Sequence, residues 1–285
     1  MSQLIITECP RDAMQGLKPF IPTETKIQYL NKLLQVGFDV IDCGSFVSPK
    51  AVPQLADTAS VIKSAHLDGS KSKLLTIVAN TRGADEAVQY EKISFLGYPF
   101  SVSETFQKRN TNSTIAEAYK TVSEIQNICM RHNKQLVVYL SMGFGNPYGD
   151  PWNEAILSGW AEQIINLGVK IVSVADTVGI AVADEISGVF SLLTESFPDI
   201  DFGVHLHCRY DNWFDKVSAA YDNGCRRFDT ALKGYGGCQF ANDALVGNLA
   251  TENLLSFLNE KKIESAINKT KFNEAMMEAN RVFVH

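Results

Sequence analysis

The sequence lacks the features that mark membrane, secreted and nucleic-acid-binding proteins. No apolar run reaches the roughly 18 residues that a membrane-spanning helix needs, and the first residues show neither the basic nor the apolar segment of a secretory leader. Lysine and arginine are scattered along the chain, and the formal net charge is -6, so no basic stripe is available to attract nucleic acid. We therefore expect neither a membrane nor a nucleic acid as a partner.

Cysteine is sparse and lacks the spacing of a structural framework. The 6 cysteines are spread over 285 residues, and none forms a Cys-x-x-Cys pair. We expect reduced thiols and a cytoplasmic location, and we interpret Cys129 and Cys225 as small core residues.

Short β-rich apolar runs alternate with longer segments of helical periodicity along the whole chain. Helices are expected at 23–36 and 114–132, and two more at 251–261 and 271–282. The alternation predicts parallel strands joined by right-handed crossovers, and eight such units close into a barrel. The predicted strands are Leu4 to Glu8, Phe38 to Cys43, Leu74 to Ala79, Lys92 to Leu96, Gln135 to Ser141, Lys170 to Ala175, Asp201 to Leu206 and Arg227 to Thr230.

The predicted fold class is α/β, a (β/α)8 TIM barrel formed by residues 1–285 as a single domain, with a C-terminal helical extension from about residue 250. A chain with 45% apolar residues and this length can bury one such core. The main alternative is an open doubly wound sheet. The first strand-to-helix turn, at residues 8–16, has no glycine-rich phosphate-binding pattern, which favours the barrel.

Polar side chains follow the carboxyl ends of several predicted strands, where barrel enzymes place their active sites. Strand seven contributes His205 and His207, and period-two alternation points both imidazoles to the same face. We expect one polar mouth that also receives residues from the ends of strands one, two and six, namely Glu8, Arg11, Asp12, Asp42, Ser45, Ser173, Asp176 and Thr177.

Two inward-facing imidazoles and the carboxylate of Asp12 indicate a divalent metal site. Imidazole and carboxylate suit Mn, Co or Zn, and additional amide or water oxygens also admit Mg. His205 and His207 could instead be hydrogen-bonded core residues, and Asp12 could be the N-cap of the first helix. Two of the 5 histidines on one strand end favour the metal.

A glycine-rich segment from Lys233 to Glu252 follows the last predicted strand. Its glycines allow backbone angles that other residues resist and let the thiol of Cys238 approach a ligand, as a lid over the mouth requires. The alternative is a simple connector with a buried thiol. Asn248, in the same segment, offers a neutral oxygen ligand.

Six motifs in order resemble the hydroxymethylglutaryl-coenzyme A lyase family. They are Pro10-Arg11-Asp12 with Gln15, and residues 40–50, 176–179, 205–207, 236–238 and 247–252. Related metal-dependent Claisen-type barrels, such as isopropylmalate and citramalate synthases, share the Arg-Asp turn, the His-x-His strand and the asparagine, but not the Gly-Gly-Cys loop. The resemblance implies retro-Claisen cleavage of 3-hydroxy-3-methylglutaryl-coenzyme A to acetyl-coenzyme A and acetoacetate, a reaction of leucine degradation.

The resemblance also implies a role for each residue of the site. The cation, Mg or Mn with Co or Zn as alternatives, is held by Asp12, His205, His207 and Asn248. Arg11 stabilises the enolate oxygen, Asp42 assists deprotonation of the substrate hydroxyl, and Cys238 protonates the enolate or shuttles the proton. The catalytic set is thus Arg11, Asp42, His205 and Cys238. The acyl part of the substrate contacts Gln15, Ser45, Ser173, Asp176, Thr177 and Glu252. Coenzyme A contacts Lys108, Arg109 and Asn110.

Departures from the family pattern leave the acyl substrate open. The family usually has glutamate at position 42 and aspartate at position 208, where this chain has Asp42 and Cys208. The shorter carboxylate could move a base by more than about 1 Å, enough to change the rate. The alternatives are a lyase for another 3-hydroxyacyl-coenzyme A, a condensing synthase of the isopropylmalate or citramalate type, and a barrel that binds without catalysis. We expect a homo-oligomer.

Overall fold

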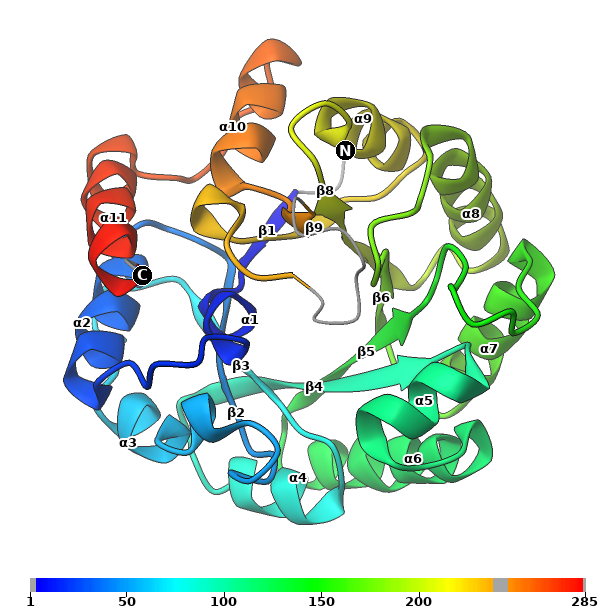
Figure 1. Cartoon of the computed structure of the whole chain (residues 1–285), viewed down its shortest axis with the longest axis horizontal. Coiled ribbons are helices and arrows are strands. Elements are labelled where there is room, and N and C mark those ends of the chain that lie inside the picture. The colour runs from blue at the N-terminus through cyan, green and yellow to red at the C-terminus, as the bar shows by residue number, and fades with distance from the viewer. Residues whose placement is uncertain (1–3, 238–245, 284–285) are drawn as a thin grey trace.

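The structure is a computed structural model that describes residues 4–237 and 246–283. Within them, eight parallel strands form a closed barrel surrounded by helices (Figure 1), which confirms the predicted TIM barrel. The first strand pairs with the second and the last, and so closes the ring. The barrel strands are β1 (Ile5–Glu8), β2 (Val40–Ser45), β3 (Lys73–Ile77), β4 (Ile93–Ser101), β5 (Gln135–Ser141), β6 (Ile171–Ala175), β7 (Asp201–His205) and β9 (Arg227–Thr230).

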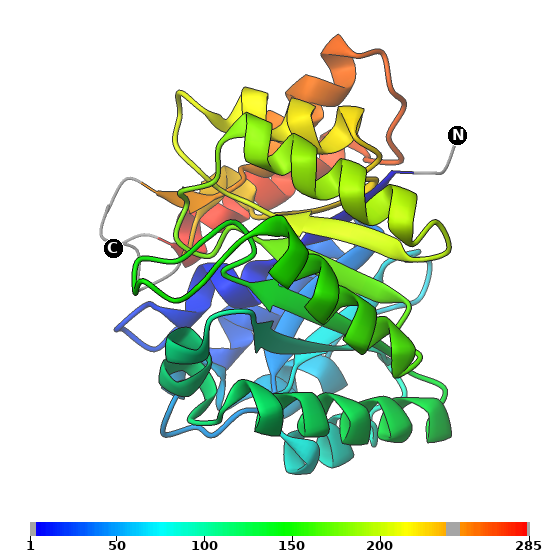
Figure 2. The ribbon, with the colours of Figure 1, turned by 90° about the vertical axis from the view of Figure 1, so that its right-hand side faces the viewer.

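Helices connect the strands and cover the outside of the barrel (Figure 2). Local sequence signals begin several of them. Pro10 occupies the first turn of α1, and Thr114 and Glu117 form a reciprocal capping box at the start of α6. The connecting helices are α1 (Pro10–Gln15), α2 (Thr23–Leu33), α3 (Thr58–Lys63), α4 (Thr81–Ala87), α5 (Glu104–Thr111), α6 (Ile115–Arg131), α7 (Glu154–Asn166), α8 (Ala183–Ser196) and α9 (Trp213–Asp222), with short 3-10 turns η1 (Pro53–Leu55) and η2 (Leu232–Gly234).

Two helices follow the last barrel strand, α10 (Thr251–Glu260) and α11 (Lys269–Val282), where the sequence predicted helices at 251–261 and 271–282. The second of these lies beside α2, as Figure 1 shows. The backbone nitrogen of Asn268 donates to the carbonyl of Val36 at 2.8 Å, and Lys32 pairs with Glu274 at 3.2 Å. The last helix therefore packs against α2, which lies between β1 and β2 in the chain.

The barrel interior is apolar over much of its length and polar at one end. An interior cluster of seven buried residues fills the apolar part: Val40, Leu75, Ile77, Phe95, Val137, Tyr139 and Ile171. A larger cluster lies between the strands and the helices. Because side chains alternate along each strand, residues two positions beyond the interior cluster also face inward, and several of these are polar.

Strand β4 is longer than predicted, because it continues through Gly97 and Pro99 to Ser101. Glycine and proline usually mark the end of a strand in sequence. In the structure, a side chain at Gly97 would lie 2.5 Å from Cδ1 of Ile77 and 3.1 Å from Cε2 of Tyr139. The glycine is therefore needed because the interior is already filled.

The predicted seventh strand is divided in the structure. β7 ends at His205, and His207 begins a separate short strand, β8 (His207–Cys208). β8 pairs antiparallel with β10 (Gly247–Asn248), with His207 opposite Asn248. A ribbon between two distant segments thus joins two predicted metal ligands, and local periodicity could not reveal this pairing.

Two further findings concern the described residues. No described helix combines the length and the apolar character needed to cross a membrane. The five described cysteines, Cys9, Cys43, Cys129, Cys208 and Cys225, are all buried and free of disulfide bonds.

Candidate metal centre and catalytic site

Side chains from distant segments meet at the carboxyl end of the barrel strands. α1 follows β1 and carries Arg11 and Asp12, while β7 ends in His205 and the β8–β10 ribbon carries His207 and Asn248. Asp12 and Asn248 are 236 positions apart, yet Nδ2 of Asn248 donates to Oδ2 of Asp12 at 2.7 Å. Closure of the barrel brings these residues together.

Asp12, His205 and His207 form a group that could hold a metal ion. One ligand atom from each lies within 4.8 Å of the other two. Burial opposes ionisation of Asp12, but Arg11 and the two histidines lower its pKa to about 2. Its carboxylate is therefore charged at neutral pH, and a charged oxygen beside two imidazoles is a donor set for a divalent cation.

Two buried acceptors near this group have no partner in the part of the chain that the structure describes. Nδ1 of His207 lies 2.9 Å from the carbonyl oxygen of Thr177, and Nε2 is buried without a hydrogen-bond partner among the described residues. The amide nitrogen of Asn248 donates to Asp12 and to the carbonyl of Tyr235, while its Oδ1 is buried and likewise unpaired in the described part of the chain. Because unpaired buried acceptors are costly, a cation that both atoms coordinate would stabilise them, so these residues fit a metal.

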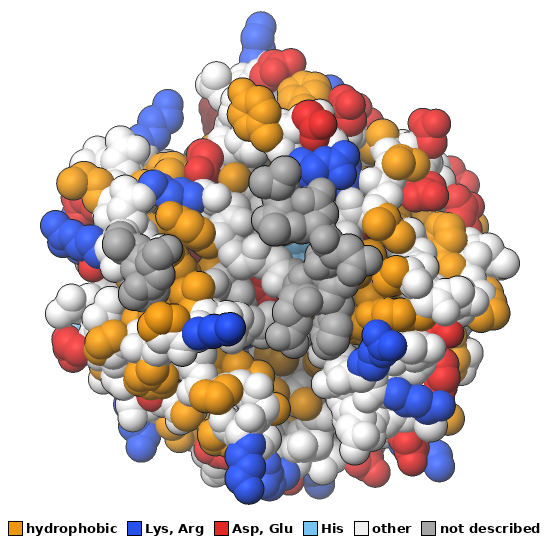
Figure 3. Space-filling view, in the orientation of Figure 1, with side chains coloured by type: hydrophobic (Ala, Val, Ile, Leu, Met, Phe, Trp, Pro, Cys, Tyr) orange, Lys and Arg blue, Asp and Glu red, His pale blue; other side chains and the backbone are white. Residues whose placement is uncertain are grey.

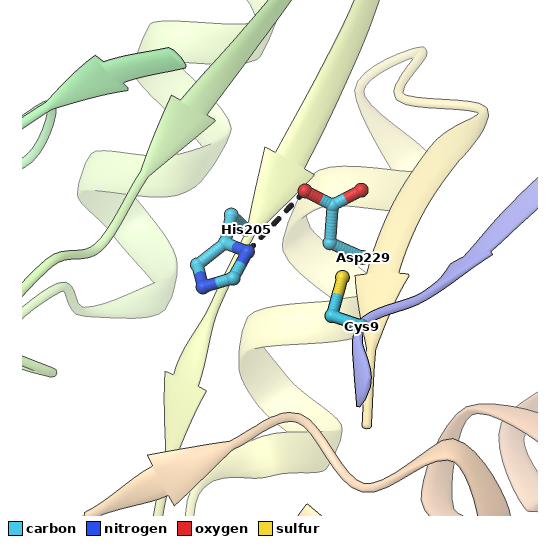
Figure 4. A group of neighbouring side chains, drawn as sticks. All are labelled: Cys9, His205 and Asp229. Carbon is cyan, nitrogen blue, oxygen red and sulfur yellow. Dashed lines mark hydrogen bonds and ion pairs between the residues drawn. The ribbon is translucent and has the colours of Figure 1, made fainter. Parts of the chain in front are cut away.

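Asp229, which sequence analysis did not identify, lies against the other histidine. Its Oδ2 is 3.3 Å from Nδ1 of His205, and the two residues are opposite each other in β9 and β7 (Figure 4). Burial lowers the pKa of His205, but Asp229 and Asp12 outweigh it and raise this pKa. A carboxylate on Nδ1 leaves Nε2 available to a metal. Alternation along the predicted strand at 227–230 points Asp229 inward, and this pattern could have identified it as a residue of the site.

Cys9 lies in the same layer of the barrel. Figure 4 shows its sulfur beside Asp229 and His205, and one ligand atom of each lies within 4.8 Å of the others. Burial raises the pKa of the Cys9 thiol well above its ordinary value, and Asp229 and Asp42 raise it further. The thiol is therefore protonated at neutral pH.

Arg11 joins the metal group to Asp42. Its Nε and Nη2 donate to Oδ2 of Asp42 at 2.9 and 2.6 Å, and its Nη1 donates to Asp12 and Gln15 at 3.0 and 2.9 Å. Burial raises the pKa of Asp42 to about 6, against the effect of Arg11. Oδ1 of Asp42 is buried with no hydrogen-bond partner in the described residues. Cys238, the predicted proton donor, lies outside those residues.

Three predicted substrate contacts differ in how freely their side chains can bind. The hydroxyls of Ser45 and Ser173 are buried and have no hydrogen-bond partner within the described ranges. The side chain of Gln15 is engaged, because it accepts from Arg11 and donates to Oδ1 of Asp12 at 2.8 Å. The structure therefore leaves the two serines free for a ligand and ties the glutamine to the metal group.

Asp176 and Thr177 were also predicted to bind substrate, but their side chains accept hydrogen bonds from other residues of the protein. Asp176 accepts from Nζ of Lys216 at 2.6 Å and from the backbone nitrogen of Ala181 at 3.1 Å. The hydroxyl of Thr177 accepts from the backbone nitrogen of Met142 at 2.7 Å. These bonds favour a supporting role, which sequence could not distinguish because it does not show the partners.

Two glutamates, Glu8 of the predicted mouth and the predicted substrate contact Glu252, make hydrogen bonds at the ends of the glycine-rich segment. Glu8 accepts from the backbone nitrogen of Leu232 at 2.7 Å and from the hydroxyl of Thr251 at 2.6 Å, and burial raises its pKa to about 8. Glu252 accepts from the backbone nitrogen of Lys233 at 3.0 Å. These contacts favour anchoring of the segment over substrate binding.

The predicted coenzyme A residues lie on the exposed side of α5. Lys108, Arg109 and Asn110 are all exposed. Lys108 pairs with Glu104 at 3.0 Å, and the guanidinium of Arg109 stacks over the ring of Tyr148 at 4.6 Å. Figure 3 shows lysine and arginine scattered over this face of the molecule. α5 therefore presents two cations to solvent near the loop that follows β5.

A family model and similar proteins of known name all point to the same group of enzymes. The HMGL-like family model matches residues 3–278. The mitochondrial hydroxymethylglutaryl-CoA lyase of Mus musculus is 31% identical over 274 residues, which cover 95% of this chain and 82% of the relative. The cytoplasmic 3-hydroxy-3-methylglutaryl-CoA lyase of Homo sapiens is also 31% identical, over 95% of this chain and 72% of the relative.

Solved structures agree with these relatives. The HMG-CoA lyase of Brucella melitensis superposes with a TM-score of 0.91 at 29% identity, covering 99% of both chains. An HMG-CoA lyase from Acinetobacter baumannii, in complex with coenzyme A and 3-methylmalate, gives a TM-score of 0.89 at 30% identity, covering 99% of this chain and 92% of that one.

Proposed function

The chain belongs to the HMGL-like family, and from that premise we propose that it cleaves 3-hydroxy-3-methylglutaryl-CoA to acetyl-CoA and acetoacetate as a metal-dependent carbon–carbon lyase. One observation carries the proposal. Nε2 of His207 and Oδ1 of Asn248, which have no partner among the described residues, lie beside the ionised carboxylate of Asp12 at the mouth of the barrel. The similarity of nearly the whole chain to HMG-CoA lyases supports the same reaction.

The four ligands that we propose are Asp12, His205, His207 and Asn248. A divalent cation bound there supplies a Lewis acid that polarises the hydroxyl and carboxylate oxygens of the substrate. Two of the four protein donors are oxygens, and the substrate adds more, which favours Mg or Mn over Co or Zn.

Asp42 is our proposed base and Arg11 our proposed stabiliser of the enolate. With its pKa raised to about 6, Asp42 is mostly ionised at neutral pH, and its Oδ1, which no described residue bonds, is available to take the hydroxyl proton. As the C2–C3 bond breaks, its electron pair moves to the thioester, and Arg11 stabilises the enolate oxygen by about 3 kcal/mol. The thiol of Cys238 then protonates the carbon of the enolate.

The acyl-CoA substrate would contact two further regions. The hydroxyls of Ser45 and Ser173, which have no partner within the described ranges, would orient its acyl part, and Lys108, Arg109 and Asn110 of α5 would contact coenzyme A. The bound coenzyme A in the Acinetobacter structure supports a ligand of this class.

A direct assay tests the proposal. Purified protein with Mg or Mn and 3-hydroxy-3-methylglutaryl-CoA should release acetoacetate, and chelation of the metal should stop the release. If acetoacetate does not form while acetyl-CoA and a 2-oxo acid release free thiol, the protein is a condensing synthase instead. If another 3-hydroxyacyl-CoA is cleaved much faster, the substrate assignment is wrong and the lyase assignment stands.

Assembly and location remain predictions. We propose a homo-oligomer, which light scattering of the purified protein would measure. We also propose a cytoplasmic location from the reduced cysteines, and fractionation of cells would test it, because relatives named as cytoplasmic and as mitochondrial are similarly close.

A further inference from the structure

Lys216 is a buried cation with no part in the chemistry described so far. It lies on α9, and its side chain is only 2% exposed. Its Nζ donates to Oδ2 of Asp176 at 2.6 Å, to the carbonyl of His207 at 2.9 Å and to the carbonyl of Gly179 at 3.2 Å. An ammonium group has three hydrogens, so all its donors are used.

These three acceptors belong to two segments that surround one metal ligand. Asp176 and Gly179 lie in the turn after β6, and His207 begins β8. The same turn supplies the carbonyl of Thr177 that lies 2.9 Å from Nδ1 of His207. Lys216 therefore fixes the backbone of His207 to the turn that also holds its ring.

The contacts of Lys216 also bear on Asn248, the other proposed ligand whose acceptor has no partner among the described residues. His207 pairs with Asn248 across the β8–β10 ribbon. Gly179 has a φ of 75°, and a side chain there would lie 2.4 Å from Cγ1 of Val246, just before β10. The turn that Lys216 holds is thus packed closely against the segment that presents Asn248.

We propose that Lys216 is a positioning residue that sets the geometry of His207 and Asn248 and so determines the affinity and coordination of the metal. The inference rests on the proposed function only in that it takes these two residues as ligands. Without Lys216, the carbonyl of His207 loses its partner, and the turn and the ribbon can move independently. Partners outside the first coordination sphere of a metal commonly matter in this way.

The test is metal binding by the substrate-free protein with Lys216→Met, which keeps the aliphatic length and loses the three donors. We expect Mn affinity, measured by calorimetry, to fall by about tenfold or more. The absorption spectrum of the Co-loaded protein should also change, because it reports the arrangement of the ligands. Neither measurement needs acyl-CoA, so a negative lyase assay would not affect this result.

Lys26→Met is the matched control. Lys26 is also 2% exposed, and among the described residues its ammonium bonds to Asp57 at 2.8 Å and to the carbonyl of Gln54, and to no proposed metal ligand. The Lys26→Met variant should lose about as much thermal stability as Lys216→Met. Its Mn affinity and the spectrum of its Co-loaded form should be those of the wild type.

A second variant guards against misfolding, because removing Lys216 alone leaves the buried carboxylate of Asp176 without its cationic partner. Asp176→Asn combined with Lys216→Met removes both charges and still leaves the carbonyl of His207 without its donor. We expect the same loss of Mn affinity. Wild-type affinity and spectrum in either folded variant would overturn the proposal, as would equal changes in Lys26→Met.

Discussion

Each histidine of the metal group has one ring nitrogen that contacts the protein and one directed to the site. For His207 the contact is the carbonyl of Thr177, and for His205 it is the carboxylate of Asp229. An imidazole that donates from Nδ1 has its lone pair on Nε2, so both rings are prepared as metal ligands. Asp229 matters more than Thr177 for charge, because the full charge of a carboxylate stabilises positive charge on the ring more strongly than a carbonyl dipole does.

We expect Asp229→Asn to weaken Mn binding by about tenfold to a hundredfold, because the amide stabilises Nδ1–H less strongly than the carboxylate. Calorimetric titration of the purified protein would measure the change. Asp201→Asn is the control, since Asp201 pairs with Arg227 at the other end of β7. Equal affinities in wild type and Asp229→Asn would rule out this role.

Asp42 should set the acidic limb of the pH–rate profile. Its pKa is raised to about 6 by burial, and a base works only when deprotonated, so kcat/KM should rise with pH up to about 6 and then level off. Asp42→Asn should reduce kcat by about a hundredfold and remove this limb. Asp39→Asn, in the turn before β2, should keep it. A limb that persists in Asp42→Asn would assign the base elsewhere.

Among the elements, β1 connects the metal group to the glycine-rich segment. Its last residue, Glu8, bonds to Leu232 at the start of that segment and to Thr251 at its end. Ala231 also pairs with Ala250, so the two ends of the segment are held together. The segment carries Asn248, and its anchoring at both ends therefore fixes where this ligand can lie.

The charge state of Glu8 should make stability depend on pH. Its pKa is raised from 4.5 to about 8 by burial, so the folded protein keeps a proton that the unfolded chain releases. Stability is therefore lost as pH rises through about 8. Glu8→Gln cannot ionise, and its thermal midpoint should fall less than that of wild type between about pH 6 and about pH 9.

Thr251→Val is the control for this measurement, because it removes a hydrogen bond to Glu8 and keeps the ionisable group. It should lower the midpoint at every pH and preserve the steep wild-type decline. Parallel curves for wild type and Glu8→Gln would show that Glu8 does not titrate in this range.

Helix α5 should contribute to binding without contributing to chemistry. Lys108→Ala with Arg109→Ala should raise KM for the acyl-CoA about fivefold and leave kcat unchanged, because exposed cations contribute only about 1 kcal/mol in total. Steady-state kinetics would measure both constants. Arg131→Ala with Lys170→Ala, which removes two exposed cations before β5 and β6, should leave both at wild-type values. A fall in kcat alone would contradict a binding role.

At the scale of the whole molecule, the site depends on closure of the barrel. β1 pairs with β9 and so places Asp12 beside the segment that carries Asn248. The unfolded chain holds these ligands far apart, and it therefore has no comparable metal site. A ligand that binds only the folded state stabilises it.

Mn at about 100 times its dissociation constant should therefore raise the free energy of unfolding by about 2.7 kcal/mol. Thermal or denaturant unfolding with Mn and with chelator would show the difference. Asp12→Ala should lose this increment, because its carboxylate supplies the negative charge of the site. An equal increment in Asp12→Ala would place the metal elsewhere.

The sequence by itself determined the barrel and most of the mouth. Strand and helix positions follow from periodicity and from start signals such as Pro10 and the Thr114 capping box, which act over a few residues. His205, His207 and Asp12 could be grouped because parallel strands in a barrel end on one side. Position along a strand is local information, and it was sufficient for that grouping.

Only the tertiary structure decided how these side chains are used. It showed that Asp176 pairs with Lys216, that Asp229 lies on His205, and that Asn248 joins His207 across a ribbon. Each contact joins segments that are far apart in the chain, so no local pattern encodes it. Whether a carboxylate at the mouth binds a ligand or a protein group depends on which partner closure of the barrel brings to it.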